Sequence, residues 1–191
     1  MKPIKDFDKI SVGNFRDLPN GAYVMKILNV ELAINSQGEY LKLGCDIAEG
    51  EFANFFMEDY KGQQKEDKKW HCFFFLNIPK DDGSEKDGWT RKKFKRFINA
   101  VEDSNPGLTW DWNEQTLKGR FIGGIFNHRE YEKTDGTVGR SANFANFCSI
   151  QMVVDGTYLP VEDKTLTVST STNNGWMSVP DNVEDEELPF A

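Results

Sequence analysis

Aromatic and basic side chains share several stretches of this 191-residue chain, in a pattern that suits contact with single-stranded nucleic acid. Flat rings can stack on unpaired bases, and Lys or Arg side chains can follow the phosphates. The candidate rings are Tyr40, Trp70, Phe73, Phe75 and Tyr131. The candidate cations are Lys42, Arg129, Lys133 and Arg140. We expect roughly half of these rings to contact nucleic acid, because most Phe side chains belong to protein cores.

Two strand-like stretches carry the first group of candidates. In one of them Leu41 and Leu43 face one way, while Tyr40 and Lys42 face the other. The stretch 70–76, W-H-C-F-F-F-L, also alternates, but both of its faces are apolar or aromatic. Its even-numbered or its odd-numbered side chains could fill the core, and the pattern leaves both alternatives open.

A late hairpin carries the second group. Strands are expected over 117–131 and near 141–154, joined by a turn at 133–137, K-T-D-G-T. Long hairpin arms of small barrels can clamp a nucleic-acid strand, and Tyr131 lies on this arm. Gly123 and Gly124, inside the first of these strands, suit sharp curvature or the close approach of another segment.

One amphipathic helix is predicted between these stretches, over 89–102. Its apolar side chains recur at helical spacing: Phe94, Phe97, Ile98 and Val101. Its opposite face carries Arg91, Lys92, Lys93, Lys95 and Arg96. We expect the helix to cap one end of a barrel and to add a weak electrostatic contribution to binding.

The remaining pattern predicts a small, mostly β domain. A bent first strand is expected over 22–34, with a bulge near 28–30, followed by a turn at 36–38. A further short strand is expected near 51–57. Five or six strands with one inserted helix favour a Greek-key barrel of the OB-fold type. We assign residues 1–159 to this domain and 160–191 to a disordered linker and acidic tail, because the latter part is rich in Ser, Thr, Asn and acids.

The tail ends in four acids and an apolar tip. These residues are Glu184, Asp185, Glu186, Glu187, Leu188, Pro189 and Phe190. Like charges keep the segment in water, and Pro189 favours an extended chain before it. The segment is therefore either bait for a basic-rimmed apolar pocket on another protein or a solubilising tail.

The sequence V-E-D-E-E-L-P-F resembles the C-terminal tip of bacterial and phage single-stranded-DNA-binding proteins. The body resembles phage-encoded members in L-P-N-G-A-Y (18–23), G-E-Y-L-K-L (38–43) and L-K-G-R-F-I-G-G-I-F-N-H-R-E-Y-E (117–132). The resemblance implies sequence-independent binding of single-stranded DNA and recruitment of replication or recombination proteins through the tip, with self-association left open. Here Ala191 follows Phe190, whereas the family usually ends on Phe.

The distribution of charge along the chain fits DNA binding better than the net charge of −8 does. From residue 160 onward there are seven acids and one base, whereas residues 61–96 hold eleven bases and six acids.

No apolar run is long enough for a membrane span, and the N-terminus lacks a signal-peptide core, so we expect a cytoplasmic protein. The three cysteines are few and far apart, which disfavours a disulfide framework.

Two other functions are kept as alternatives. One is an adaptor in phage recombination or replication that works through the tail and hardly binds DNA. The other is a metal-dependent nuclease using carboxylates such as Asp46, Glu58 and Asp59. Phosphate-loop, nucleophile-elbow and zinc-ligand spacings are missing from the sequence, so we expect no enzymatic activity, no cofactor and no metal.

Overall fold

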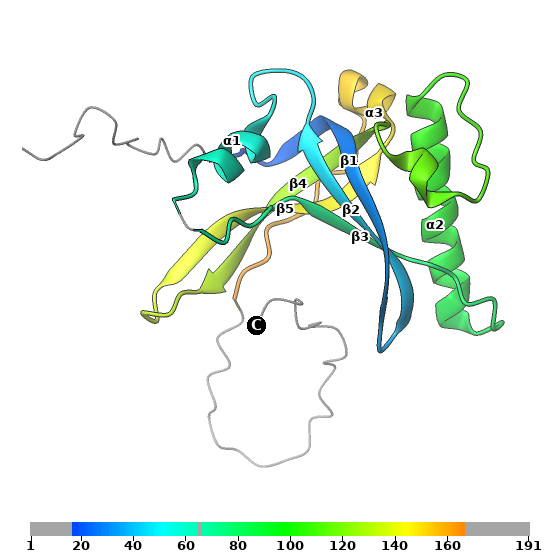
Figure 1. Cartoon of the computed structure of the whole chain (residues 1–191), viewed down its shortest axis with the longest axis horizontal. Helices are drawn as coiled ribbons and strands as arrows, with labels where there is room; N and C mark the ends of the chain where they lie inside the picture. The colour runs from blue at the N-terminus through cyan, green and yellow to red at the C-terminus, as the bar shows by residue number, and fades with distance from the viewer. Residues whose placement is uncertain (1–16, 65, 167–191) are drawn as a thin grey trace, which may run out of the picture.

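A five-stranded antiparallel sheet organises the chain (Figure 1). The structure is a computed structural model, and it describes residues 17–64 and 66–166. The strands are β1 (Gly21–Asn35), β2 (Gly38–Ile47), β3 (Phe73–Asn77), β4 (Phe121–Glu132) and β5 (Val138–Cys148). The helices of the described part are α1 (Phe55–Gly62), α2 (Glu85–Ser104), α3 (Ile150–Asp155) and the short 3-10 helix η2 (Glu114–Leu117). The fold is therefore mixed α/β, and not mostly β with a single inserted helix.

The long strand β1 lies at the centre of the sheet, whose order is β3-β2-β1-β4-β5. Its first half pairs with β4 and its second half with β2, and the β1–β2 register shifts between Ile27 and Asn29. This shift confirms the predicted bulge, which bends the strand so that it can serve both partners. The predicted turns at 36–38 and 133–137 are also confirmed.

The sheet does not close into a barrel, so that part of the prediction was wrong. In the described residues β3 pairs only with β2, and β5 pairs only with β4. Rings fill the seam between these two edge strands. The Phe74 ring of β3 lies 5.0 Å from that of Phe144 and 5.4 Å from that of Phe147, both on β5. These bulky side chains close the seam by packing in place of backbone hydrogen bonds.

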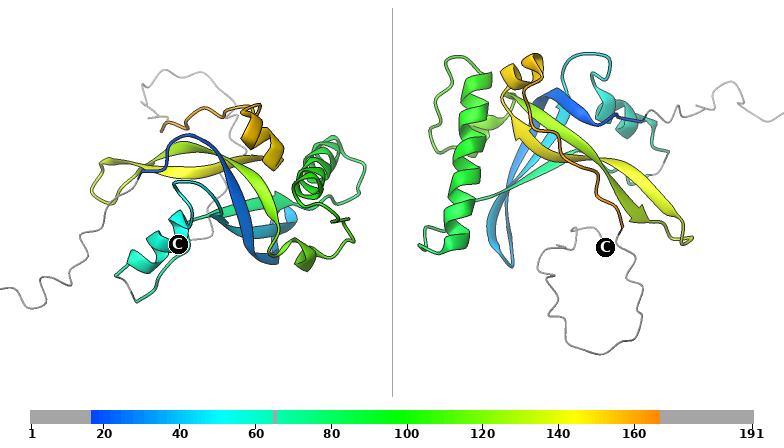
Figure 2. Two further views of the ribbon diagram at one scale, coloured as in Figure 1. Left: turned by 90° about the horizontal axis from the view of Figure 1, so that it is seen from above. Right: turned by 180° about the vertical axis from the view of Figure 1, so that it is seen from behind.

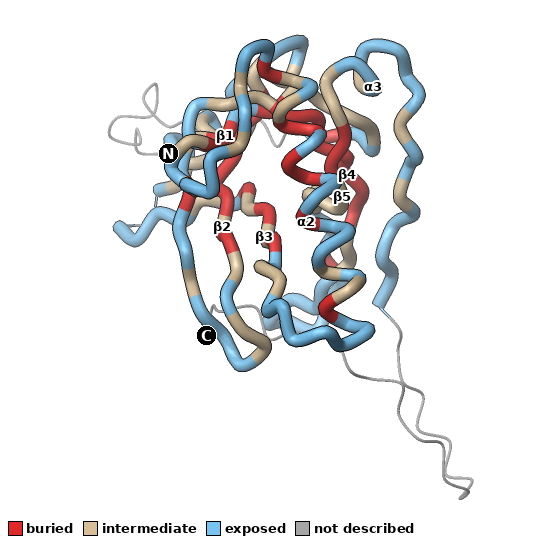
Figure 3. Tube along the Cα trace, turned by 90° about the vertical axis from the view of Figure 1, so that its right-hand side faces the viewer, coloured by how far each residue is buried: buried red, intermediate tan, exposed pale blue. Residues whose placement is uncertain are grey.

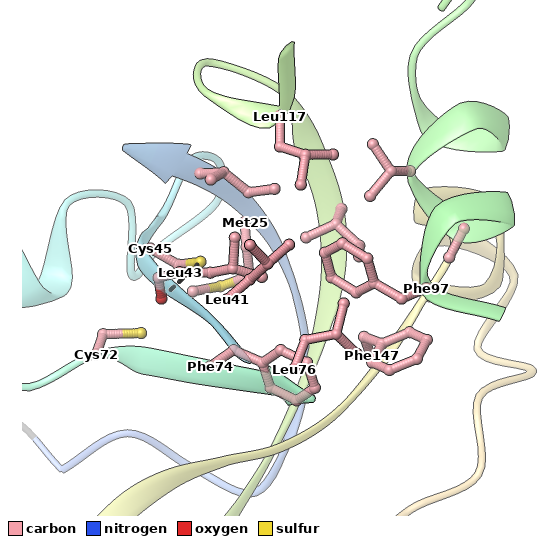
Figure 4. Packing of buried hydrophobic residues seen from close by; sticks show 14 of the residues in the cluster. Met25, Leu41, Leu43, Cys45, Cys72, Phe74, Leu76, Phe97, Leu117 and Phe147 are labelled. Carbon is pink, nitrogen blue, oxygen red and sulfur yellow. Dashed lines mark hydrogen bonds between the residues drawn. The ribbon is translucent and has the colours of Figure 1, made fainter. Parts of the chain in front are cut away.

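The predicted amphipathic helix is confirmed as α2, which is longer than expected and lies beside the sheet (Figures 1 and 3). It begins at Glu85 because the Ser84 hydroxyl accepts a hydrogen bond from the Asp87 backbone N–H. Its apolar face enters the core: the rings of Phe97 and Phe74 stack with centroids 6.0 Å apart (Figure 4). Burial of this stripe stabilises the helix far more than its intrinsic propensity does.

Helix α1 replaces the strand predicted near 51–57. The N-cap residue before the helix, Asn54, has a left-handed conformation, and its side chain makes no capping hydrogen bond. The cap comes from β2 instead, because the Asp46 carboxylate accepts hydrogen bonds from the backbone N–H groups of Phe56 and Met57 at 3.0 and 3.1 Å. Burial raises the pKa of Asp46, while these N–H groups and that of Ile47 act in the opposite direction.

The segment after α3 contacts the sheet, although residues from 160 onward were predicted to form a disordered linker. Residues 162–166 run beside β4, in parallel with it, where β1 no longer covers that edge (Figure 2, right). The Lys164 N–H donates to the His128 carbonyl at 2.8 Å, and the Glu130 N–H donates to the Lys164 carbonyl at 2.9 Å. We call residues 162–166 the strap. Residues 160–166 thus belong to the folded body, and the remainder of the predicted linker and tail lies outside the described residues.

None of the helices in the described part of the chain combines the length and apolar character needed to cross a membrane.

Close packing at Gly123 gives a first testable prediction. A Cβ placed there would lie 2.6 Å from Cys148 Sγ and 3.0 Å from the Cys148 carbonyl oxygen, which belongs to the backbone of β5. We expect Gly123→Ala to lower the free energy of unfolding by about 1–3 kcal/mol, measured by urea titration. Gly88→Ala in α2 is the control, since its Cβ meets nothing within 4 Å. It should leave stability unchanged or raise it by up to ~1 kcal/mol. Equal losses in both variants would contradict the packing described.

Candidate nucleic-acid interface

Strand alternation brings four of the predicted site residues onto one surface. On β2, Leu41 and Leu43 are buried, so Tyr40 and Lys42 face outward. On β3, Phe74 and Leu76 are buried and the odd-numbered rings face outward, which resolves the alternative left open by the sequence. We call the surface formed by Tyr40, Lys42, Phe73 and Phe75 the β2–β3 face.

The pairing register sets the geometry of the β2–β3 face. Lys42 pairs directly with Phe75, and Tyr40 pairs with Asn77. The Phe75 ring lies 5.9 Å from the Tyr40 ring and 6.2 Å from the Phe73 ring. The three rings thus form a continuous row, and each keeps part of its surface in contact with solvent.

Lys42 places a cation over this row. Its Nζ atom lies 4.6 Å from the centroid of the Phe73 ring and 3.8 Å from a carboxylate oxygen of Glu31 on β1. The Glu31 side chain of this ion pair is exposed, so the pair contributes little to stability in water. A phosphate approaching the rings could therefore compete with Glu31 for Lys42 at small cost.

Trp70 lies apart from the β2–β3 face. Its indole Nε1–H donates to the carbonyls of Cys45 and Cys72 at 3.2 and 2.9 Å, and its ring packs against that of Tyr60 at 5.9 Å. These contacts tie the start of β3 to β2. The ring is mostly enclosed by protein and serves packing.

The hairpin formed by β4 and β5, which we call the β4–β5 arm, presents Tyr131 and Lys133 to solvent. Tyr131 pairs with Gly139 and keeps 45% of its surface exposed. A Cβ on Gly139 would lie 2.5 Å from the Tyr131 ring, so the glycine lets the ring lie flat on β5. Lys133 is exposed at the turn, and Arg129, which pairs with Ser141, is partly buried.

Arg140 binds the strap. Its Nη2 group donates to His128 Nδ1 at 2.9 Å and to an Asp163 carboxylate oxygen at 2.6 Å. The other Asp163 oxygen accepts from the His128 backbone N–H and from the side-chain amide of Asn20. These contacts hold the pKa of Asp163 below its usual range, with the His128 N–H as the largest cause. Sequence reasoning missed this role because Asp163 falls in a segment predicted to be disordered.

Two of the three residues named for a nuclease, Asp46 and Asp59, have other partners in the structure. Asp46 caps α1, and Asp59 lies 2.8 Å from His71 Nδ1. Within residues 17–64 and 66–166, no three His, Cys, Asp or Glu side chains are grouped closely enough to hold a metal ion. Burial raises the pKa of the Cys148 thiol to about 11 and raises those of the two other cysteines as well, so these thiols stay protonated near neutral pH.

No protein-family model matches the chain, and no curated protein matches it.

The strap contacts give a second prediction. Arg140→Gln should weaken the link to Asp163, because it removes the charge from that hydrogen bond. The amide N–H groups of Lys164 and Leu166 should then exchange with solvent roughly ten times faster, as measured by hydrogen exchange. Lys133→Gln, on the same arm, is the matched control and should leave both amides unchanged. Unchanged exchange in Arg140→Gln would show that this side chain does not hold the strap.

Proposed function

We propose that this protein binds single-stranded DNA with little sequence preference, and that the β2–β3 face is the primary contact. The observation that carries this proposal is the row of three rings with Lys42 above it. Stacking needs an exposed flat ring and tolerates any base, while the cation offsets phosphate charge. The resemblance to phage and bacterial single-stranded-DNA-binding proteins supports the same function.

We further propose that the body is an opened member of the OB-fold class. The strand order β3-β2-β1-β4-β5 is what remains of a five-stranded Greek-key barrel when the pairing between its third and fifth strands is absent. OB-folds bind oligonucleotides on the face of strands 2 and 3, between the loops that follow strands 1 and 4. The β2–β3 face has that location, and Tyr131 and Lys133 lie on or beside the second of those loops.

We assign the tail to partner recruitment. The acids 184–187 would meet a basic rim, and Leu188, Pro189 and Phe190 would fill an apolar pocket on a replication or recombination protein. Leu166, the last described residue, donates its N–H to a Glu130 carboxylate oxygen on the β4–β5 arm at 3.1 Å. The tail therefore starts beside the arm, and this tether keeps its acids at high effective concentration near the DNA site.

Binding should depend on the outward rings and not on Trp70. We expect Phe75→Ala to weaken binding of fluorescent oligo-dT by roughly five- to a hundredfold, as for the loss of one stacked base. Trp70→Phe should lower thermal stability, because it removes the indole N–H that donates to the Cys45 and Cys72 carbonyls. It should leave the affinity nearly unchanged, because this ring lies apart from the β2–β3 face. Affinity should fall as salt rises. Equal affinity for duplex DNA of the same length would overturn the proposal.

The tail should separate recruitment from DNA binding. Deleting residues 182–191 should tighten oligo-dT binding modestly at low salt and abolish capture of host replication or recombination proteins. Phe190→Ala should abolish capture alone, because it removes the apolar anchor and keeps every charge. Weaker DNA binding after truncation, or capture of the same proteins by Phe190→Ala, would contradict this assignment.

A further inference from the structure

The outward side of α2 carries a second pairing of ring and cation. Trp89, Lys92 and Arg96 follow one another at i, i+3 and i+7, opposite the buried stripe of the helix. Trp89 is 66% exposed, which is unusual for the largest apolar side chain. Lys92 Nζ lies 4.9 Å from the Trp89 ring centroid. The same chemistry occurs on the β2–β3 face, where Lys42 lies over Phe73. We call these three residues the α2 face.

Two of the acids near the start of the helix are paired with a cation outside the α2 face. Asp81 and Asp87 both pair with Arg91, whereas Glu85 lies one helical turn before Trp89. Lys92 and Arg96 project from the other side of the helix and are exposed. Lys92 and Arg96 outnumber Glu85, so the α2 face keeps a net positive charge that can attract a polyanion.

Residues next to the β2–β3 face and residues of the first turns of α2 border a common hollow. Strand β3 leads through residues 78–84 directly into the first turns of α2 (Figure 1). Between them lies a hollow of about 300 Å³, lined by residues of the β1–β2 turn, the end of β3 and the first turns of α2. Asn77, which pairs with Tyr40, is among the lining residues, as is Lys86. Tyr40 thus marks the end of the ring row that is nearer to α2.

The surroundings of Trp89 favour a stacked base over an apolar peptide tip. Its four neighbours one helical turn away, Glu85, Lys86, Lys92 and Lys93, are all charged. A Leu-Pro-Phe tip needs an apolar pocket, which charged neighbours on a convex helix do not supply. A base needs only the flat side of one ring.

We propose that single-stranded DNA bound on the β2–β3 face continues onto the α2 face, where Trp89 stacks on a base and Lys92 and Arg96 hold phosphates. This inference rests on the proposed function and extends it to longer strands. The bound length then exceeds what the sheet alone can cover.

Oligonucleotide length tests the extension. Oligo-dT of roughly 5 nucleotides, near the lower limit for one OB-fold, should bind only the β2–β3 face, and roughly 20 nucleotides should reach both surfaces. Trp89→Ala should weaken binding of the long oligonucleotide about fivefold or more and leave the short one unchanged. Equal effects on both lengths, or none on either, would overturn the inference.

Salt dependence tests the two cations independently of the Trp89 ring. Lys92→Gln together with Arg96→Gln should reduce the slope of log K against log salt by about 1.4 for the long oligonucleotide alone, since each phosphate contact contributes ~0.7. Lys118→Gln, an exposed lysine after η2, is the matched control and should leave the slope unchanged. An unchanged slope in the double variant would count against the α2 face.

Two further outcomes of these experiments distinguish the proposed DNA path from its alternatives. If wild-type protein binds neither oligonucleotide, the proposed function itself fails. If Trp89→Ala keeps DNA binding but loses a synthetic peptide of residues 182–191, the α2 face binds an acidic protein segment and the DNA path is wrong. Circular dichroism and thermal unfolding of each variant confirm that it is folded, and the exposure of Trp89 predicts little loss of stability.

Discussion

The inward position of Phe74 is the constraint on which the arrangement depends. Its ring packs against Phe97 of α2 and against Phe144 and Phe147 of β5, so a single side chain joins the sheet edges and the helix. Because neighbouring side chains of a strand point to opposite faces, burying Phe74 forces Phe73 and Phe75 outward. The same packing that closes the seam without hydrogen bonds therefore also creates the ring row. Core and candidate interface are two faces of one short strand.

Local patterns in the sequence were enough to predict the elements whose causes are local. The bulge in β1, both hairpin turns and α2 follow from alternation, turn residues and helical spacing near each position. Helix α1 was missed because Asp46 caps it from β2, and no nearby residue supplies that cap. The strap was missed for the same reason, since Asp163 is held by Asn20, His128 and Arg140, all distant in sequence. Contacts between distant positions leave no periodic signal in a single sequence.

Contacts between distant positions also decide which side chains of the candidate site are available to bind DNA, and the sequence alone could not predict them. Arg140 and Lys42 have equal charge and were equally good candidates. Arg140 contacts a buried histidine and a carboxylate that is itself held by two other donors, whereas Lys42 lies over a ring and beside the exposed carboxylate of Glu31. Trp70 and Phe73 differ likewise, because one ring has an N–H that finds two carbonyls and the other has none. Residue type defines the candidates, and the neighbours supplied by the fold decide among them.

The strap has a mechanical consequence. It runs parallel to β4, and its backbone bonds to β4 are flanked by the side-chain bonds of Asp163 and Glu130. A pull on the chain beyond Leu166 in the direction of β4 loads these bonds together, in shear. A pull at right angles to β4 would open them one after another, starting at Leu166. The body therefore resists tension on its C-terminal tether most strongly along one axis, which is the axis of the β4–β5 arm.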